Sequence, residues 1–145
     1  MNLVFPDVTA HSVSRLLVHL VWATWGPEHA IDATLDEPLE RALLGKAREL
    51  RAAVHASGAA LDHVHVLVQL PADVRVAVVV QRLKGATSHA FRRHLRGGWQ
   101  AGYWAESVSP EAAHAIARYV RAQRVHHESG VQNEPWQMEP AGRRA

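Results

Sequence analysis

Three segments of the chain have the apolar pattern of β-strands. Residues 14–25, SRLLVHLVWATW, alternate between polar and apolar positions and are rich in β-branched and aromatic side chains. Residues 60–71, ALDHVHVLVQLP, form a nearly continuous apolar run typical of a buried strand, with a short hairpin partner expected around residues 59–62. Residues 103–109, YWAESVS, predict a third, shorter strand.

Three other segments place apolar residues three and four positions apart, which predicts amphipathic helices. Each carries a start or stop signal, such as a proline in the first turn, a Ser or Asp cap, or a glycine at the end. The predicted helices and their signals are residues 35–58 (Pro38, Gly58), 73–95 (Asp73) and 109–127 (Ser109, Pro110). The chain from residue 129 onward is expected to be irregular.

The alternation of strands and helices predicts an α+β fold in which helices sandwich an antiparallel sheet. A chain of 145 residues with 48% hydrophobic content fits one domain, expected at residues 1–130, followed by a tail at residues 131–145. No segment approaches the roughly 20 apolar residues that cross a bilayer, and the first residues lack the pattern of a secretion signal. We therefore expect a cytoplasmic protein without a membrane segment.

Positive charge is concentrated in one block of the chain. Residues 75–124 carry nine Lys or Arg against two Asp or Glu, a net charge of +7, whereas residues 1–74 carry five against nine. A solvated basic helix face is one interpretation. However, Trp99, Tyr103 and Trp104 lie within this block, and single-stranded nucleic acid needs cations for its backbone and flat rings for its bases. Nucleic acid is therefore the leading candidate partner.

His63 and His65 are two residues apart in the second strand and therefore point to the same face. Burying two imidazoles among Val and Leu side chains is costly unless something pairs them, which favours metal or phosphate chemistry over a structural role. The chain has no cysteine, so a metal would be held by nitrogen and oxygen. A third ligand must come from elsewhere in the chain or from another molecule.

Tyr119 and Gln123 lie four residues apart on one face of the last predicted helix. Tyr119 by itself could be a core residue with its hydroxyl at the rim. Arg118, Arg121 and Arg124 surround it in the sequence, however, and positive charge favours the phenolate that attacks a phosphodiester. An amide oxygen from Gln123 beside two imidazoles would make an open site for a divalent ion.

Five blocks of the sequence occur in an order that resembles the TnpA-type single-tyrosine HUH transposases of the smallest bacterial insertion sequences, which move as single-stranded DNA. The blocks are HLVWAT, DHVHVLVQLP, LKGATSHAF, GYWAESVS and ARYVRAQRVHH, and together they cover about residues 14–128. HUH denotes His-hydrophobic-His, here His63-Val64-His65. The resemblance implies a ferredoxin-like or RRM-like HUH fold.

The resemblance also implies an activity and a set of site residues. Tyr119 would be the catalytic nucleophile, and His63, His65 and Gln123 would hold Mg²⁺ or Mn²⁺. The implied enzyme nicks and rejoins single-stranded DNA with hairpin ends through a 5′-phosphotyrosine, as a homodimer whose active sites are shared between subunits. The residues expected to contact DNA are Arg82, Lys84, Arg92, Arg93, Arg118 and Arg121.

Two other functions remain compatible with these residues. A catalytically idle or domesticated relative would bind hairpin DNA without cleaving it. An unrelated metal-dependent hydrolase would turn over small phosphoesters without forming a covalent protein adduct. The joint presence of His63, His65, Tyr119 and Gln123 favours the active enzyme, because an idle copy has no chemical reason to keep all four.

Overall fold

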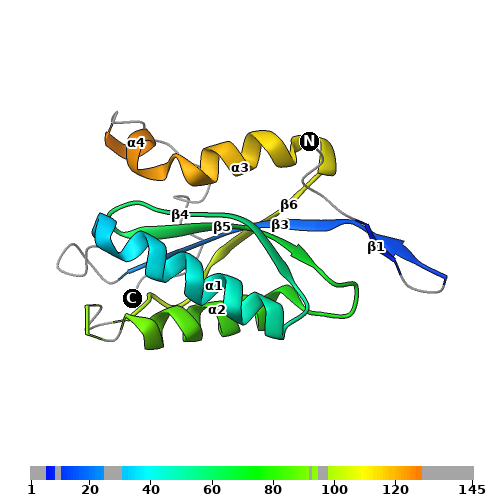
Figure 1. Ribbon diagram of the computed structural model, residues 1–145, viewed down its shortest axis with the longest axis horizontal. Coiled ribbons are helices and arrows are strands. Elements are labelled where there is room, and N and C mark those ends of the chain that lie inside the picture. Colours follow the sequence, from blue (N-terminus) through cyan, green and yellow to red (C-terminus); the bar gives the residue numbers. More distant parts are fainter. Residues whose placement is uncertain (1–5, 9–10, 25–30, 92, 95–97, 129–145) are drawn as a thin grey trace, which may run out of the picture.

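A four-stranded antiparallel sheet forms the centre of the computed structural model, which describes residues 6–8, 11–24, 31–91, 93–94 and 98–128. Its strand order is β4-β5-β3-β6. The strands are β3 (Leu16–Ala23), β4 (Ala53–Ala59), β5 (His63–Leu70) and β6 (Trp104–Val108). A ribbon of β1 (Asp7–Val8) and β2 (Val13–Ser14), which the sequence pattern did not predict, extends from the start of β3 away from the body of the molecule (Figure 1).

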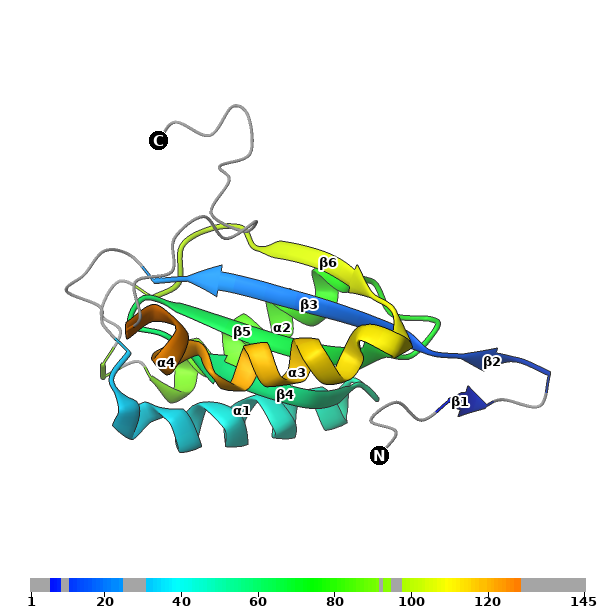
Figure 2. The same cartoon turned by 90° about the horizontal axis from the view of Figure 1, so that it is seen from above.

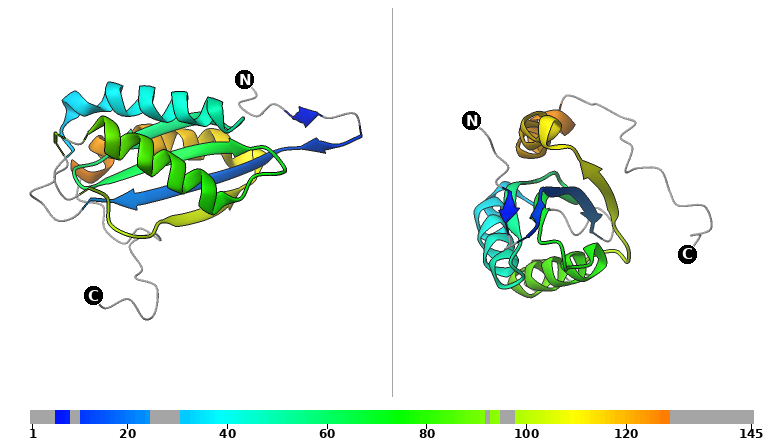
Figure 3. Two further views of the ribbon diagram at one scale, coloured as in Figure 1. Left: turned by 90° about the horizontal axis from the view of Figure 1, so that it is seen from below. Right: turned by 90° about the vertical axis from the view of Figure 1, so that its right-hand side faces the viewer.

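Helices cover both faces of the sheet (Figure 3). One face carries α1 (Asp36–Glu49) and α2 (Val76–Ala90), and the other carries α3 (Ala113–Arg121) followed by α4 (Gln123–Glu128). Short 3-10 turns at Ala33–Leu35 (η2) and Pro110–Ala112 (η3) lead into α1 and α3. The chain order β3-α1-β4-β5-α2-β6 with this strand order is the ferredoxin-like arrangement, which confirms the predicted fold class. None of the helices in the described ranges is long and apolar enough to span a membrane.

The side chains of β5 build two different cores, because this strand is buried along its whole length. Its even-numbered side chains, such as Val64 and Val66, pack into the large core with β3, α1 and α2. Leu67, on the odd-numbered face, lies in a smaller core with Ala117 and Val120 of α3. The two histidines share the odd-numbered face and therefore lie between the sheet and α3.

The first helix is shorter than predicted, and the last part of the segment expected to be helical, from Ala53 onward, belongs to the strand β4. α1 ends at Glu49, and Arg51 then takes the left-handed backbone conformation, with φ of 58°. Glycine usually takes this position, so an arginine there gives no signal in the sequence that the helix ends. Gly58, predicted as the stop, lies inside β4, which is also a longer hairpin partner of β5 than the one predicted at residues 59–62.

The predicted cap of the second helix is also wrong. α2 begins after Arg75, which makes no capping hydrogen bond, while Asp73 accepts two bonds of 2.8 Å from the guanidinium of Arg51. These bonds lower the pKa of the Asp73 carboxyl below its usual value. Ser109 does cap as predicted, since its Oγ accepts a 3.3 Å bond from the N–H of Ala112. The predicted tail lies outside the described residues.

Candidate functional site

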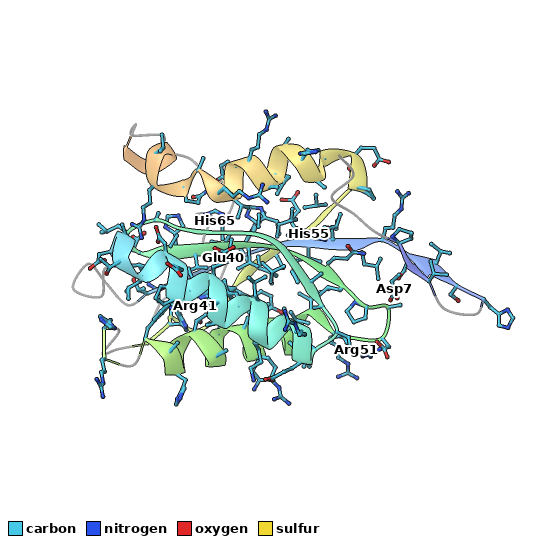
Figure 4. The ribbon with its side chains drawn as sticks, in the orientation of Figure 1. Asp7, Glu40, Arg41, Arg51, His55 and His65 are labelled. Carbon is cyan, nitrogen blue, oxygen red and sulfur yellow. The ribbon has the colours of Figure 1, made fainter. Side chains whose placement is uncertain are left out.

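His63 and His65 lie side by side on the face of β5 that α3 covers, where Figure 4 labels His65. Their ring centroids are 5.0 Å apart, and the residues are 2% and 0% exposed. Nδ1 of His63 lies 2.7 Å from a carboxylate oxygen of Asp62, and Nδ1 of His65 lies 2.9 Å from Nε2 of His19 on β3. With Nδ1 engaged, Nε2 is the nitrogen through which each ring can bind a metal ion.

α3 brings Tyr119 to these rings within the same chain. The helix runs over β4 and β5 (Figure 2), and the centroid of the Tyr119 ring lies 5.5 Å from that of His65, edge to face. The face of α3 toward the sheet carries Ala113, Ala117 and Val120, which are spaced four and three residues apart and therefore form one stripe along the helix. The predicted nucleophile and the two predicted histidine ligands therefore meet at one place.

A glycine in β4 allows α3 to approach the sheet closely. Gly58 pairs with His65 on the neighbouring strand. A Cβ atom on Gly58 would stand 1.9 Å from the carbonyl oxygen of Val120 and 3.5 Å from Cγ of Gln123. The missing side chain of Gly58 thus lets the end of α3 and Gln123 pack closely against the strand that pairs with His65.

Gln123 is fully buried, but it lies on a different helix from Tyr119. The helix predicted over residues 109–127 is divided at Ala122, so that α3 ends one residue before it and Gln123 begins α4. The side-chain amide of Gln123 donates a 2.9 Å bond to the Tyr119 carbonyl. Within the described residues its Oε1 is buried without a hydrogen-bond partner, a costly state that a bound cation would relieve.

These donors fit a divalent ion. Imidazole nitrogens from His63 and His65 together with the amide oxygen of Gln123 could hold such an ion and would leave coordination positions for phosphate oxygens and water. In the part of the chain that the structure describes, no three His, Asp, Glu or Cys side chains are grouped so that they could hold a metal. Among the described residues, the Gln123 amide is the group of another kind that could serve as a third protein ligand.

Comparison with known families decides the relationship of the chain. The sequence model of the IS200-like transposases matches residues 12–123, which run from the start of the sheet to Gln123. The chain belongs to the IS200-like transposase family. The transposase thus has the two histidines, the tyrosine and the glutamine inside the matched range.

Two solved structures share the fold of this transposase. One is a protein from Deinococcus radiodurans R1 assigned as a transposase, with 24% identity, a TM-score of 0.63, and 81% of this chain and 98% of that chain covered. The other is a REP-associated tyrosine transposase bound to a REP hairpin, with 15% identity, a TM-score of 0.62, and 87% and 75% covered. No curated protein matches the sequence.

The sequence pattern assigned no role to His19, which contacts several rings of the site. Its centroid lies 5.1 Å from His65, 5.9 Å from Tyr119 and 5.1 Å from Trp104 on β6, and the residue is 5% exposed. Its position depends on the register of β3 against β5, in which His19 is opposite Leu67. The register is set by the whole sheet and cannot be read from one segment. The sequence therefore shows that a predicted strand contains a histidine, but not that this histidine meets His65.

Two of the three arginines expected around the phenol hold the helical segment of the transposase in place. The guanidinium of Arg121 donates a 2.9 Å bond to the carbonyl of His55 on β4. Arg124 forms a two-point ion pair with Asp36 at the start of α1, with N–O distances of 2.6 and 2.8 Å. The carboxylate of Asp36 thus balances the positive charge of Arg124, and this ion pair joins α4 to α1.

Lys84 and Trp99 join α2 to the segment that leads into β6. The ammonium of Lys84 donates to the carbonyls of Gln100 and Gly102 at 2.7 and 2.9 Å, and burial lowers its pKa. The indole N–H of Trp99 lies 3.0 Å from Oγ1 of Thr87 and 3.1 Å from the Lys84 carbonyl. Both side chains therefore support the fold, and two of the three N–H donors of Lys84 are used in doing so.

Four of the cations expected to contact DNA are exposed, among them Arg121, which also bonds to the His55 carbonyl. Arg82 lies on α2, Arg93 just after this helix, and Arg118 on α3. Arg92 lies outside the described residues. Among the aromatic residues expected to stack on bases, Tyr103 is 44% exposed and accessible to a ligand.

Proposed function

We propose that this transposase nicks and rejoins single-stranded DNA at the ends of an insertion sequence, with Tyr119 as the nucleophile. The observation that carries the proposal is the distance of 5.5 Å between the ring centroids of Tyr119 and His65 within one chain. A phenol beside a site suited to a divalent ion is what phosphodiester transfer to tyrosine requires.

The proposal includes Mg²⁺ or Mn²⁺ held by His63, His65 and Gln123. When bound, the ion would neutralise charge that develops on the phosphate oxygens. The protein contributes the orientation of the ligands. Asp62 engages Nδ1 of His63, and the amide nitrogen of Gln123 is bonded to the Tyr119 carbonyl, which leaves its buried oxygen as the atom for the ion. The buried position of these donors limits competition from bulk water.

The proposed step conserves the phosphodiester bond energy. After losing its phenolic proton, the oxygen of Tyr119 forms a bond to phosphorus, the bond from phosphorus to the 3′ oxygen breaks, and this oxygen leaves as a 3′-hydroxyl after taking up a proton. The 5′ end of the DNA remains attached to the protein as a phosphotyrosine. Attack by another 3′-hydroxyl on this phosphotyrosine releases Tyr119 and rejoins the strands without ATP.

Single-stranded DNA with hairpin ends is the proposed partner, by analogy with the REP hairpin bound by the structural relative. Arg41, Lys46, Arg82 and Glu49 line a groove of about 890 Å³ formed by α1 and α2. These two helices lie on the sheet face opposite α3 (Figure 3). The three cations of the groove outnumber the carboxylate of Glu49, which is paired with Lys46 at 2.7 Å. We propose that phosphates of a hairpin stem bind in this groove and that the exposed Arg118 on α3 contacts the strand that is cut. We also propose a homodimer in which the active sites are shared between subunits.

Covalent attachment of DNA to the protein tests the proposal. Tyr103, the other tyrosine of the chain, provides the control. Wild type, Tyr119→Phe and Tyr103→Phe are incubated with Mn²⁺ and a single-stranded oligonucleotide carrying the hairpin from the DNA flanking the gene, and adducts are separated on denaturing gels. We expect Tyr119→Phe to form no adduct and Tyr103→Phe to form it at the wild-type level. The proposal is wrong if the adduct persists in Tyr119→Phe.

The same assay distinguishes the alternatives. A wild-type chain that binds the hairpin but forms no adduct with any divalent ion is the idle relative. A chain that hydrolyses small phosphoesters without an adduct is an unrelated hydrolase. Either result excludes strand transfer by Tyr119.

A further inference from the structure

A hydrogen bond joins two imidazoles inside the candidate metal site. Nε2 of His19 lies 2.9 Å from Nδ1 of His65, and the ring planes are tilted by 31°. One proton is shared in such a bond, so one nitrogen donates and the other accepts. For Nε2 of His65 to bind a metal ion it must carry a lone pair, which places the proton on Nδ1 and makes Nε2 of His19 the acceptor.

We propose that His19 is a positioning residue that fixes the tautomer and the ring orientation of His65 as a metal ligand, an inference that rests on the proposed metal site. Each imidazole of the pair then has its own acceptor. Asp62, the residue before His63, serves that ring with an exposed carboxylate, whereas His65 is served by a buried ring from another strand.

The place of His19 in the sheet makes it suited to this role. β3 is hydrogen-bonded to β5 on one side and to β6 on the other, so the backbone of His19 is fixed from both sides. Its ring stands edge-on to Trp104 and to Tyr119, with interplanar angles of 83° and 80°. Packing therefore holds Nε2 of His19 toward His65. A residue that orients a metal ligand through a hydrogen bond must itself be held in this way.

Two substitutions distinguish the contribution of the acceptor nitrogen of His19 from the contribution of its ring. His19→Phe keeps a flat ring against Trp104 and Tyr119 but has no acceptor for His65. His19→Gln loses the ring but can place an amide oxygen near the former position of Nε2. His63→Ala, which removes a proposed ligand directly, reports on the metal site itself. His19→Leu repeats the loss of the acceptor with a smaller side chain if the phenylalanine variant does not fold.

The measurement is Mn²⁺ binding to the full chain without DNA, by electron paramagnetic resonance of the free ion, with folding checked by circular dichroism. We expect His19→Phe to weaken Mn²⁺ binding by about 10- to 100-fold, the usual effect of removing a residue that hydrogen-bonds to a metal ligand. His19→Gln should bind Mn²⁺ nearly as tightly as the wild type. Wild-type affinity in His19→Phe, or equal loss in both variants, overturns the role of His19. Binding that His63→Ala leaves unchanged instead overturns the metal site of the proposed function.

Discussion

Replacing Gly58 with alanine should lift α3 from the sheet. The added methyl would stand 1.9 Å from the Val120 carbonyl oxygen, whereas ordinary contact begins at 3.4 Å, so the helix backbone must retreat by the difference, about 1.5 Å. The obstruction is backbone, on a helix that packs against the sheet, and no side-chain rotation relieves it. The φ of Gly58 lies outside the left-handed region, so the alanine itself brings no conformational strain.

The size of the effect follows from this displacement. Forcing a methyl into a filled contact costs about 1–3 kcal/mol of stability. A shift of about 1 Å at a reacting group can lower a rate about 100-fold. Because Gly58 lies between His65 and Gln123, we expect both effects together: a loss of about 1–3 kcal/mol in the free energy of unfolding and about 100-fold slower adduct formation.

Gly45→Ala is the matched control. Gly45 lies inside α1, and a Cβ there would have nothing within 4 Å. Alanine in a helix interior is favoured over glycine by about 0.5–1 kcal/mol, so this variant should be more stable in urea, whereas Gly58→Ala should be less stable. If Gly58→Ala matches wild type in both stability and rate, the close contact of α3 with β4 does not position Tyr119.

Two further predictions concern ion pairs. Arg124→Gln and Asp36→Asn break the same two-point pair, and a double-mutant cycle by urea unfolding should give a coupling of about 1 kcal/mol, whereas additive effects would mean that the pair does not hold α4. Arg51→Met should lower the urea midpoint at neutral pH but not in acid. The pKa of Asp73 is lowered in the folded chain, so its contribution is fully present above the ordinary value of 3.8 and is lost as the pH falls through the lower folded value. If the urea midpoints of the wild type and Arg51→Met still differ at about pH 2, this reasoning is wrong.

Much of the fold and site follows from local periodicity. The two-residue period of a strand is enough to place His63 and His65 on one face, and the structure has both on β5. The helical period and the Ser109 cap are enough to place Tyr119 on a helix after the last strand. These features depend on neighbours within a few positions, which a sequence pattern records.

The features that escaped the sequence depend on contacts between distant segments. The end of α1 is set by a left-handed arginine, and β4 is recognisable as a strand only through its pairing with β5. The role of Gly58 follows from a helix that arrives more than sixty residues later in the chain, at Val120. His19 meets His65 only through the register of two strands.

The histidines and the tyrosine are fastened to the molecule in different ways. β5 is an inner strand, bonded along both edges, so the backbone that carries the two imidazoles is held by hydrogen bonds from both neighbouring strands. The segment from α3 to α4 makes no ladder bonds and rests on one layer of packing and on its arginine anchors. Because no described strand pairs with this segment, moving it would break no bond of the sheet. The proposed sharing of active sites between subunits would require such independence of the nucleophile from the strands.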